Sequence, residues 1–185
     1  MIVYLHGFCS SPASWKSQLL AEEMARRGLA AQFVCPQLSP VPDEAVAGVS
    51  RLIEQAGGAV TLVGSSLGGH YANHLAEKHG LNAVLINPAT VDRINLAKFV
   101  GDHAHFHTGE PFTFTEAHAA QLKAQVRQPT PERYWLLVET GDEVLDYRQA
   151  VDFYAGSRQT VLPGGDHGFT QFPDFVPQII EYAGL

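Results

Sequence analysis

Short apolar runs alternate with amphipathic stretches along almost the whole chain. The apolar runs predict strands at residues 3–5, 31–35, 60–63, 83–86, 134–139 and 159–162. Between them, apolar side chains at helical spacing predict helices over residues 14–27, 43–55, 66–79, 146–154 and 174–182. Continuous apolar strands are typical of a sheet covered on both faces, and strands that alternate with helices form parallel βαβ units. The pattern therefore predicts an α/β fold with about six mostly parallel strands and helices on both faces.

Residues 90–131 interrupt this alternation. They hold no clear strand, carry several histidines and phenylalanines, and predict one helix over residues 116–126. Long irregular segments inside compact domains usually serve a function. We therefore expect a small lid or cap insertion at residues 90–131 within a single domain that spans residues 1–185. The alternative is an ordinary crossover helix with an irregular approach.

Composition narrows the class of partner. Twelve Lys and Arg against 19 Asp and Glu give a net charge of −7, which argues against nucleic acid and anionic membranes as partners. No apolar run is long enough to span a bilayer, and the first residues lack the charged start of a signal peptide. We expect a cytoplasmic protein, a monomer or a homodimer. Cys9 and Cys35 are then free thiols, with one disulfide as the alternative.

The main chemical signal is a G-x-S-x-G motif at residues 64–68, between a predicted strand and a predicted helix. This context is what a nucleophile elbow requires, because the serine must sit on a tight strand-to-helix turn. Ser66 is its centre, since Ser65 would be flanked by Val63 and Leu67 instead of glycines. The alternative is a glycine-rich turn without chemistry. Phosphate-binding motifs do not fit the glycine spacing.

A serine hydroxyl needs a general base, which is itself held by an acid. In folds with this elbow the chain order is serine, acid, histidine. His167 lies in a glycine-rich turn between the last predicted strand and the last helix, at the carboxyl edge of the sheet. It is the one histidine that follows Asp142. We therefore predict His167 as the base.

Asp142 is the predicted acid, because it follows Gly141 just beyond the fifth predicted strand. Asp146 is the next candidate, although it is better placed to cap the following helix. The other carboxylates nearby are less favoured: Glu139 is still within the strand, Glu143 points elsewhere if Asp142 points in, and Asp166 adjoins the base.

Acyl transfer also needs donors for an oxyanion. One donor is expected to be the backbone N–H of Leu67, the residue after the nucleophile, and the other the backbone N–H of Phe8 in the loop after the first strand. His6, Gly7 and Ser65 are expected to support this site or to contact the substrate.

Several other residues carry weaker signals. Cys9 is disfavoured as a nucleophile. The alternating histidines at 103, 105 and 107 would share one face of an extended segment and so could bind a metal, but only Asp102 adds a carboxylate, and we expect no metal there. Two further sets of residues could either line the cleft or simply pack in the core. They are His70 and His74 on the third helix, and Phe106, Phe112 and Phe114 in the insertion.

Seven segments together resemble one known family: residues 4–8, 10–12, 63–69, 87–89, 140–150, 164–167 and Phe169. The chain resembles the small bacterial esterases of the YqiA type, within the α/β-hydrolase superfamily. The resemblance implies a minimal α/β-hydrolase fold and an esterase with Ser66, Asp142 and His167 as its catalytic triad. Residues 98–120 do not match the family pattern, so the resemblance does not extend to the shape of the lid.

These observations predict a carboxylesterase that cleaves small-molecule acyl esters through an acyl-enzyme and needs no cofactor. The nearest alternatives on the same triad are an acyl-CoA thioesterase and an acyltransferase. A non-catalytic binding protein with this fold is the alternative from a different class.

Overall fold

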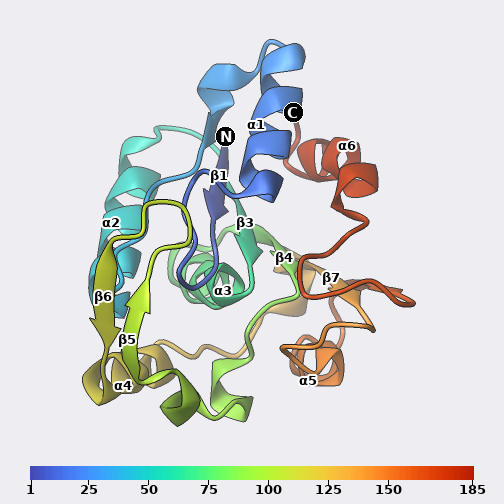
Figure 1. Ribbon diagram of the computed structural model, residues 1–185. Helices are drawn as coiled ribbons and strands as arrows, with labels where there is room; N and C mark the ends of the chain where they lie inside the picture. The colour runs from blue at the N-terminus through green and yellow to red at the C-terminus, as the bar shows by residue number, and fades with distance from the viewer.

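A computed structural model of the chain describes residues 1–185 and contains a six-stranded sheet in which all neighbouring strands are parallel (Figure 1). The strand order is β2-β1-β3-β4-β7-β8. The strands are β1 (Ile2–Leu5), β2 (Phe33–Val34), β3 (Thr61–Ser65), β4 (Asn82–Ile86), β7 (Tyr134–Glu139) and β8 (Arg158–Leu162). The predicted parallel sheet is confirmed. The second strand is shorter than expected because a 3₁₀ turn at Ala30–Gln32 takes its first residues.

Helices cover both faces of this sheet, as predicted. The helix α1 (Trp15–Arg26) lies beside α6 (Phe172–Tyr182) on one face (Figure 1). The other face is covered by α2 (Pro42–Gln55), α3 (Leu67–His79) and α5 (Tyr147–Phe153), with α4 (Glu116–Ala124) packed outside them. No helix has the length and apolar character to cross a membrane.

The strand β7 shows how the two layers share one sheet. Tyr134, Leu136 and Val138 pack in the core cluster under α2 and α3, whereas Trp135 and Leu137 pack under α1 and α6. All five are at most 1% exposed. Because successive side chains of a strand point to opposite faces, a strand buried on both sides reads as one apolar run.

The insertion at residues 90–131 contains two strands, and the expectation that it holds none is wrong. The strands β5 (Gly101–Ala104) and β6 (Pro111–Phe114) form an antiparallel hairpin (Figure 1). Only Phe114 among their residues is fully buried, and β5 contains no β-branched residue, so the hairpin lacks the apolar run that marked the other strands. The helix predicted after it is confirmed as α4.

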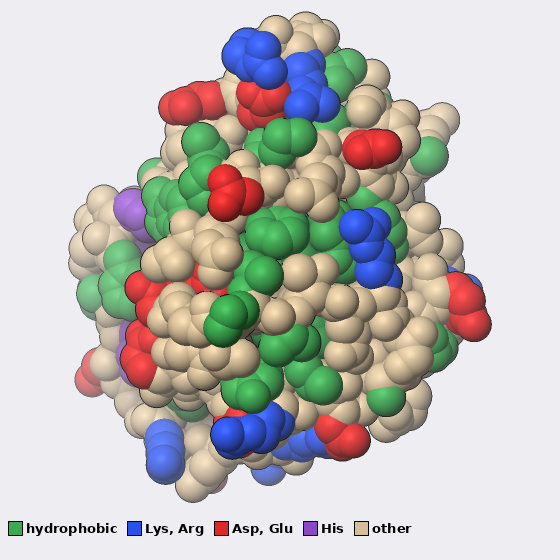
Figure 2. All heavy atoms as spheres, turned by 90° about the vertical axis from the view of Figure 1, so that its right-hand side faces the viewer, with side chains coloured by type: hydrophobic (Ala, Val, Ile, Leu, Met, Phe, Trp, Pro, Cys, Tyr) green, Lys and Arg blue, Asp and Glu red, His purple; other side chains and the backbone are tan.

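Charge on the visible surface is dispersed. On the face drawn in Figure 2, the Lys and Arg side chains lie in separate places among acidic and apolar ones and do not form one basic patch. Cys9 and Cys35 are both free thiols.

Candidate active site

Ser66 lies on the turn between β3 and α3 with φ 55° and ψ −121°. A positive φ is strained for a residue with a Cβ and is typical of functional turns. The two glycines of the motif permit this turn, because a Cβ on Gly68 would overlap the carbonyl of Leu5, and one on Gly64 would overlap the carbonyl of Gly68. The chain around Ser66 thus has the close backbone approach that a nucleophile elbow requires.

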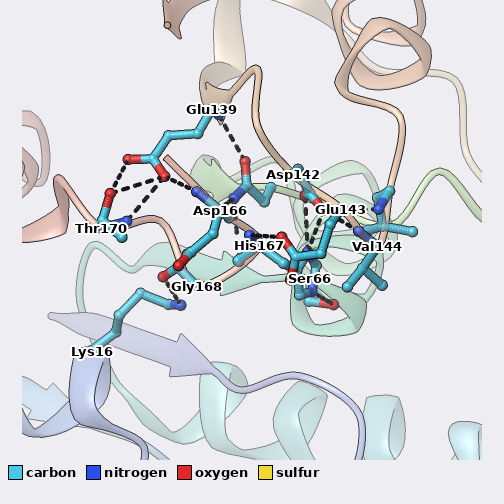
Figure 3. Close-up of polar contacts among 12 residues, drawn as sticks. Lys16, Ser66, Glu139, Asp142, Glu143, Val144, Asp166, His167, Gly168 and Thr170 are labelled. Atoms are coloured by element: carbon cyan, nitrogen blue, oxygen red, sulfur yellow. Dashed lines mark hydrogen bonds and ion pairs between the residues drawn. The ribbon is translucent and has the colours of Figure 1, made fainter. Parts of the chain in front are cut away.

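The structure brings the three predicted catalytic residues together (Figure 3). The Oγ of Ser66 lies 3.0 Å from Nε2 of His167, and Nδ1 of His167 lies 2.8 Å from Oδ2 of Asp142. The Asp142 side chain is 1% exposed and the His167 side chain 22%. Asp142 Oδ1 also accepts hydrogen bonds from the backbone N–H groups of Val144 and Leu145, at 2.9 and 2.8 Å. These bonds fix the carboxylate against the imidazole.

The backbone N–H groups of Phe8 and Leu67 donate no hydrogen bond to another protein group. Both residues line the cavity beside Ser66. Gly7 lies against the serine, since a Cβ placed on it would be 3.2 Å from Ser66 Cβ. The two N–H groups expected to bind an oxyanion are therefore unpaired and available to a ligand.

His6 supports the loop that carries Phe8. Its ring Nδ1 donates to the carbonyl of Gly7 at 3.0 Å, and Nε2 accepts from the N–H of Leu38 at 3.1 Å. Burial lowers the pKa of His6, which favours the neutral ring that this pair of contacts requires. Ser65, the other expected supporting residue, is 6% exposed and lines the same cavity.

The loop that carries His167, residues 164–171, is held by a buried carboxylate that the sequence analysis considered only as a less favoured catalytic acid. Glu139 is fully buried at the end of β7 and accepts hydrogen bonds from the backbone N–H groups of Asp166, Thr170 and Gln171 at 2.8, 3.0 and 3.0 Å (Figure 3). The Thr170 hydroxyl donates to it as well, at 3.2 Å. The sequence signal that could have pointed to this role is a charged residue, Glu139, at the end of an otherwise apolar strand.

Asn87, at the end of β4, joins the same network. Its side-chain amide donates to the carbonyls of Asp166 and His167 at 3.0 and 3.2 Å, and its Oδ1 accepts from the N–H of Glu139 at 3.0 Å. The residue is 2% exposed and has φ 39°. Two strand ends are thereby connected to the backbone that presents His167.

The remaining nearby carboxylates have other partners. Glu143 accepts from the backbone N–H of His167 at 3.0 Å and does not contact its ring; hydrogen bonds from its own N–H and from that of His167 lower its pKa. Asp146 caps α5 by accepting from Arg148 N–H at 3.1 Å, as predicted. Asp166 contributes backbone groups to the Glu139 and Asn87 network.

A cavity of about 360 Å³ opens beside Ser66 and His167, and most of the residues that line it are hydrophobic. The insertion supplies much of this apolar wall through Ile94, Leu96, Phe99, Phe106, Phe114 and Leu122. Of the three phenylalanines considered from the sequence, Phe106 and Phe114 line the cavity, whereas Phe112 packs against the ring of Phe8. Lys16 and Ser14, at the start of α1, also line it.

The histidines at 70, 74, 103, 105 and 107 do not line the cavity. His103 donates from Nε2 to the carbonyl of Phe99 at 2.6 Å, and His107 bonds the Ser11 hydroxyl at 2.9 Å. His70 and His74 are buried on α3 and do not line the cavity. No three His, Cys, Asp or Glu residues lie close enough to hold a metal ion. Cys9 is 7% exposed, and burial raises the pKa of its thiol.

The chain matches one protein family and resembles several solved structures in fold. A model of the family described as "Uncharacterised protein family (UPF0227)" matches residues 1–184. Among solved structures, a putative hydrolase from Agrobacterium vitis S4 superposes with a TM-score of 0.73 and is 18% identical. The match covers 98% of this chain and 87% of that one.

Two further solved structures have a similar fold over nearly the whole chain. The alpha/beta hydrolase domain-containing protein 10 from mouse gives a TM-score of 0.72 at 17% identity, over 99% of this chain and 89% of that one. Est1E from Butyrivibrio proteoclasticus gives 0.72 at 11% identity, over 98% and 87%. At these identities the likeness concerns the fold, and it confirms the predicted α/β-hydrolase fold.

Proposed function

Because the chain belongs to the UPF0227 family, which is the YqiA-type family expected from its sequence motifs, we propose that it is a serine hydrolase that cleaves carboxylic esters. The observation that carries this proposal is the chain of hydrogen bonds from Ser66 through His167 to Asp142 beside an apolar cavity. The substrate is a small-molecule acyl ester. The insertion at residues 90–131 forms the cover of its binding cavity and the wall for its acyl chain.

The first half of the reaction forms an acyl-enzyme. His167 Nε2 takes the proton of Ser66 as the serine oxygen attacks the ester carbonyl, and the N–H groups of Phe8 and Leu67 bind the oxyanion. Asp142 keeps the proton of His167 on Nδ1 and stabilises the imidazolium. His167 then gives its Nε2 proton to the alcohol oxygen, and the alcohol leaves with that proton.

The second half releases the acid. Water takes the place of the alcohol, His167 accepts one of its protons, and the resulting hydroxide attacks the acyl-enzyme carbonyl. Collapse of the tetrahedral intermediate returns the proton to Ser66 and frees the carboxylic acid. The same residues would cleave a thioester, and comparing the rates for matched acyl esters and acyl thioesters would decide between the two substrates.

The test is hydrolysis of 4-nitrophenyl esters with two to twelve acyl carbons by the wild type and by Ser66→Ala. We expect the substitution to lower kcat/KM by at least about 10³-fold, the order of loss seen when a triad member is removed. Ser157→Ala is a matched control, because its hydroxyl has no hydrogen-bond partner and does not line the cavity. A Ser66→Ala variant with nearly the wild-type rate would remove Ser66 from the mechanism.

A further inference from the structure

Lys16 is a buried lysine that the proposed mechanism does not use. It is the second residue of α1, it is 8% exposed, and it lines the same cavity as Ser66 and His167. Its Nζ donates to the carbonyl of Gly168 at 2.6 Å, one residue beyond the predicted base (Figure 3). A positive charge therefore lies in the wall of a mostly apolar cavity, beside the groups proposed to carry out the reaction.

This charge has no ion-pair partner. Lys16 takes part in none of the salt bridges of the chain, so no carboxylate oxygen lies within 4.0 Å of its Nζ. Burial lowers the pKa of Lys16 to about 8, and the more distant Asp166, Glu139 and Asp142 only partly oppose that effect. An ammonium group has three donors, and here only one of them bonds to the protein. The ring of Trp15, with its centroid 5.3 Å from Nζ, offsets only part of the cost of burying a charge without an ion pair, so an anionic partner is expected to come from a ligand.

A second polar group on the same wall is also unpaired. The hydroxyl of Ser14 is buried, has no hydrogen-bond partner and belongs to a residue that lines the cavity. Ser14 is the N-cap of α1, yet its side chain makes no capping bond, so the first turn of the helix has no side-chain acceptor. The positive end of the α1 dipole is then added to the charge of Lys16. Both residues line one cavity in a protein whose net charge is −7.

A purely structural role would not need the charge. A tether to the Gly168 carbonyl requires one N–H donor, and an amide would supply it without burying an ammonium group. We propose that Lys16 Nζ, in the cavity wall that Ser14 also lines, binds one anionic group, a carboxylate or a phosphate, of the ester that is hydrolysed at Ser66. The proposal rests on the proposed function and names the class of substrate: an acyl ester with a negative charge near its ester bond.

The experiment compares esters that differ by one carboxylate group. One pair places the charge on the alcohol side: 3-carboxy-4-nitrophenyl butyrate against 4-nitrophenyl butyrate. The other places it on the acyl side: mono-4-nitrophenyl adipate against 4-nitrophenyl hexanoate. The proteins are the wild type, Lys16→Met, Lys16→Gln and Lys123→Met. Lys123 is the matched control, because it is an exposed lysine of α4 that does not line the cavity, and its loss changes the net charge equally.

We expect Lys16→Met to lower kcat/KM for the charged member of at least one pair about tenfold more than for its neutral partner, because a charge-assisted hydrogen bond is lost. The affected pair tells whether the alcohol or the acyl part carries the anion. Lys123→Met should change both members equally. If Lys16→Met does not fold, Lys16→Gln retains a donor for the Gly168 carbonyl and should show the same selective loss.

Equal losses for charged and neutral esters in both pairs would overturn the anion site and leave Lys16 as a tether of the His167 loop. That result would leave the proposed function intact, provided that the wild type hydrolyses the neutral esters and Ser66→Ala does not. Absence of hydrolysis of all four esters by the wild type would overturn both proposals.

Discussion

The His167 loop, residues 164–171, and the insertion, residues 90–131, reach the same cavity but are fixed by different contacts. The backbone of the His167 loop accepts hydrogen bonds from the side chains of Lys16 and Asn87 and donates hydrogen bonds to those of Glu139 and Glu143. The insertion also makes hydrogen bonds at its edges, such as the one from the N–H of Phe106 to the carbonyl of Cys9 at 2.8 Å, but its cavity wall meets the Phe8 loop through aromatic packing. The ring of Phe8 contacts those of Phe99, Phe112 and Phe114, with centroids 6.0, 5.6 and 5.4 Å away.

The two kinds of contact suit two kinds of task. Hydrogen bonds depend steeply on distance and angle, so they fix the position of a proton-transfer group within narrow limits. Apolar contacts have little directional preference and tolerate changes of shape. We therefore expect the His167 loop to set the rate of the chemical step and the insertion to set which acyl chain fits.

The largest expected effect comes from placing a methyl group in the elbow. Gly68→Ala would force a Cβ into the backbone of Leu5, and we expect it to lower the free energy of unfolding by more than about 3 kcal/mol or to prevent folding. Gly109→Ala is the counterpart in the insertion. No atom lies within 4 Å of its Cβ, so only its φ of 72° opposes the change, at about 1–2 kcal/mol. Urea unfolding of both variants measures the difference, and equal losses would contradict it.

Removing the buried carboxylate is expected to have the next largest effect. Glu139→Ala leaves three backbone N–H groups of the His167 loop without an acceptor, and kcat should fall by about 10–100-fold with a smaller change in KM. Glu139→Gln retains one acceptor oxygen, so its kcat should lie between those of the wild type and Glu139→Ala. Thr113→Ala, which removes an exposed hydrogen bond to Asp102 in the hairpin, should alter neither constant by more than about twofold. A loss in KM alone for Glu139→Ala would exclude the positioning role.

Acid should loosen the junction between the insertion and α3. His70 on α3 is 3% exposed and lies against Leu122 and Gln125 at the end of α4, and burial lowers its pKa from 6.5 to about 3, with His74 and Arg127 adding repulsion. The unfolded chain binds this proton more readily. The stabilisation is therefore complete above about pH 6.5 and is lost as the pH falls toward 3, by about 1.4 kcal/mol per unit for one group. The free energy of unfolding, measured from denaturation curves between pH 3 and 7, should fall less steeply with acid in His70→Leu than in the wild type. An equally steep fall would assign the effect to other groups.

The smallest expected effect is in the apolar wall. Phe99→Ala enlarges the cavity beside Phe8, and we expect kcat/KM for the best wild-type ester to fall about 3–10-fold, while the optimum moves to a longer acyl chain. Val100→Ala is a control, because its side chain is exposed and does not line the cavity. A Phe99→Ala optimum at the wild-type chain length would show that the insertion does not select the acyl group.

The same contrast explains which parts of the molecule the sequence reveals. The strand β7 was predicted at both of its ends, because its residues form one apolar run buried on both faces. Ser66, Asp142 and His167 follow strand ends in a fixed order, so the sequence could select them, and they lie within hydrogen-bond distance; their catalytic roles remain predictions. The hairpin β5–β6 was missed, because β5 contains no β-branched residue and neither strand has a continuous apolar run.

The network around Glu139 was also missed, for a different reason. Its partners are backbone N–H groups of a loop that is distant in the sequence, and every residue except proline has such a group. No pattern of side chains records which N–H groups meet a given carboxylate. The unpaired charge of Lys16 is hidden in the same way, since an isolated lysine near a helix start is typical of a solvated surface.

The most direct test of the account is covalent labelling of the native protein with a fluorophosphonate, followed by digestion and mass spectrometry of the peptides. The reagent mimics the tetrahedral intermediate and reacts only with an activated serine. We expect one adduct, on Ser66, and none in Ser66→Ala. A native protein that forms no adduct, or forms it on another residue, would contradict the assignment of Ser66 as the nucleophile.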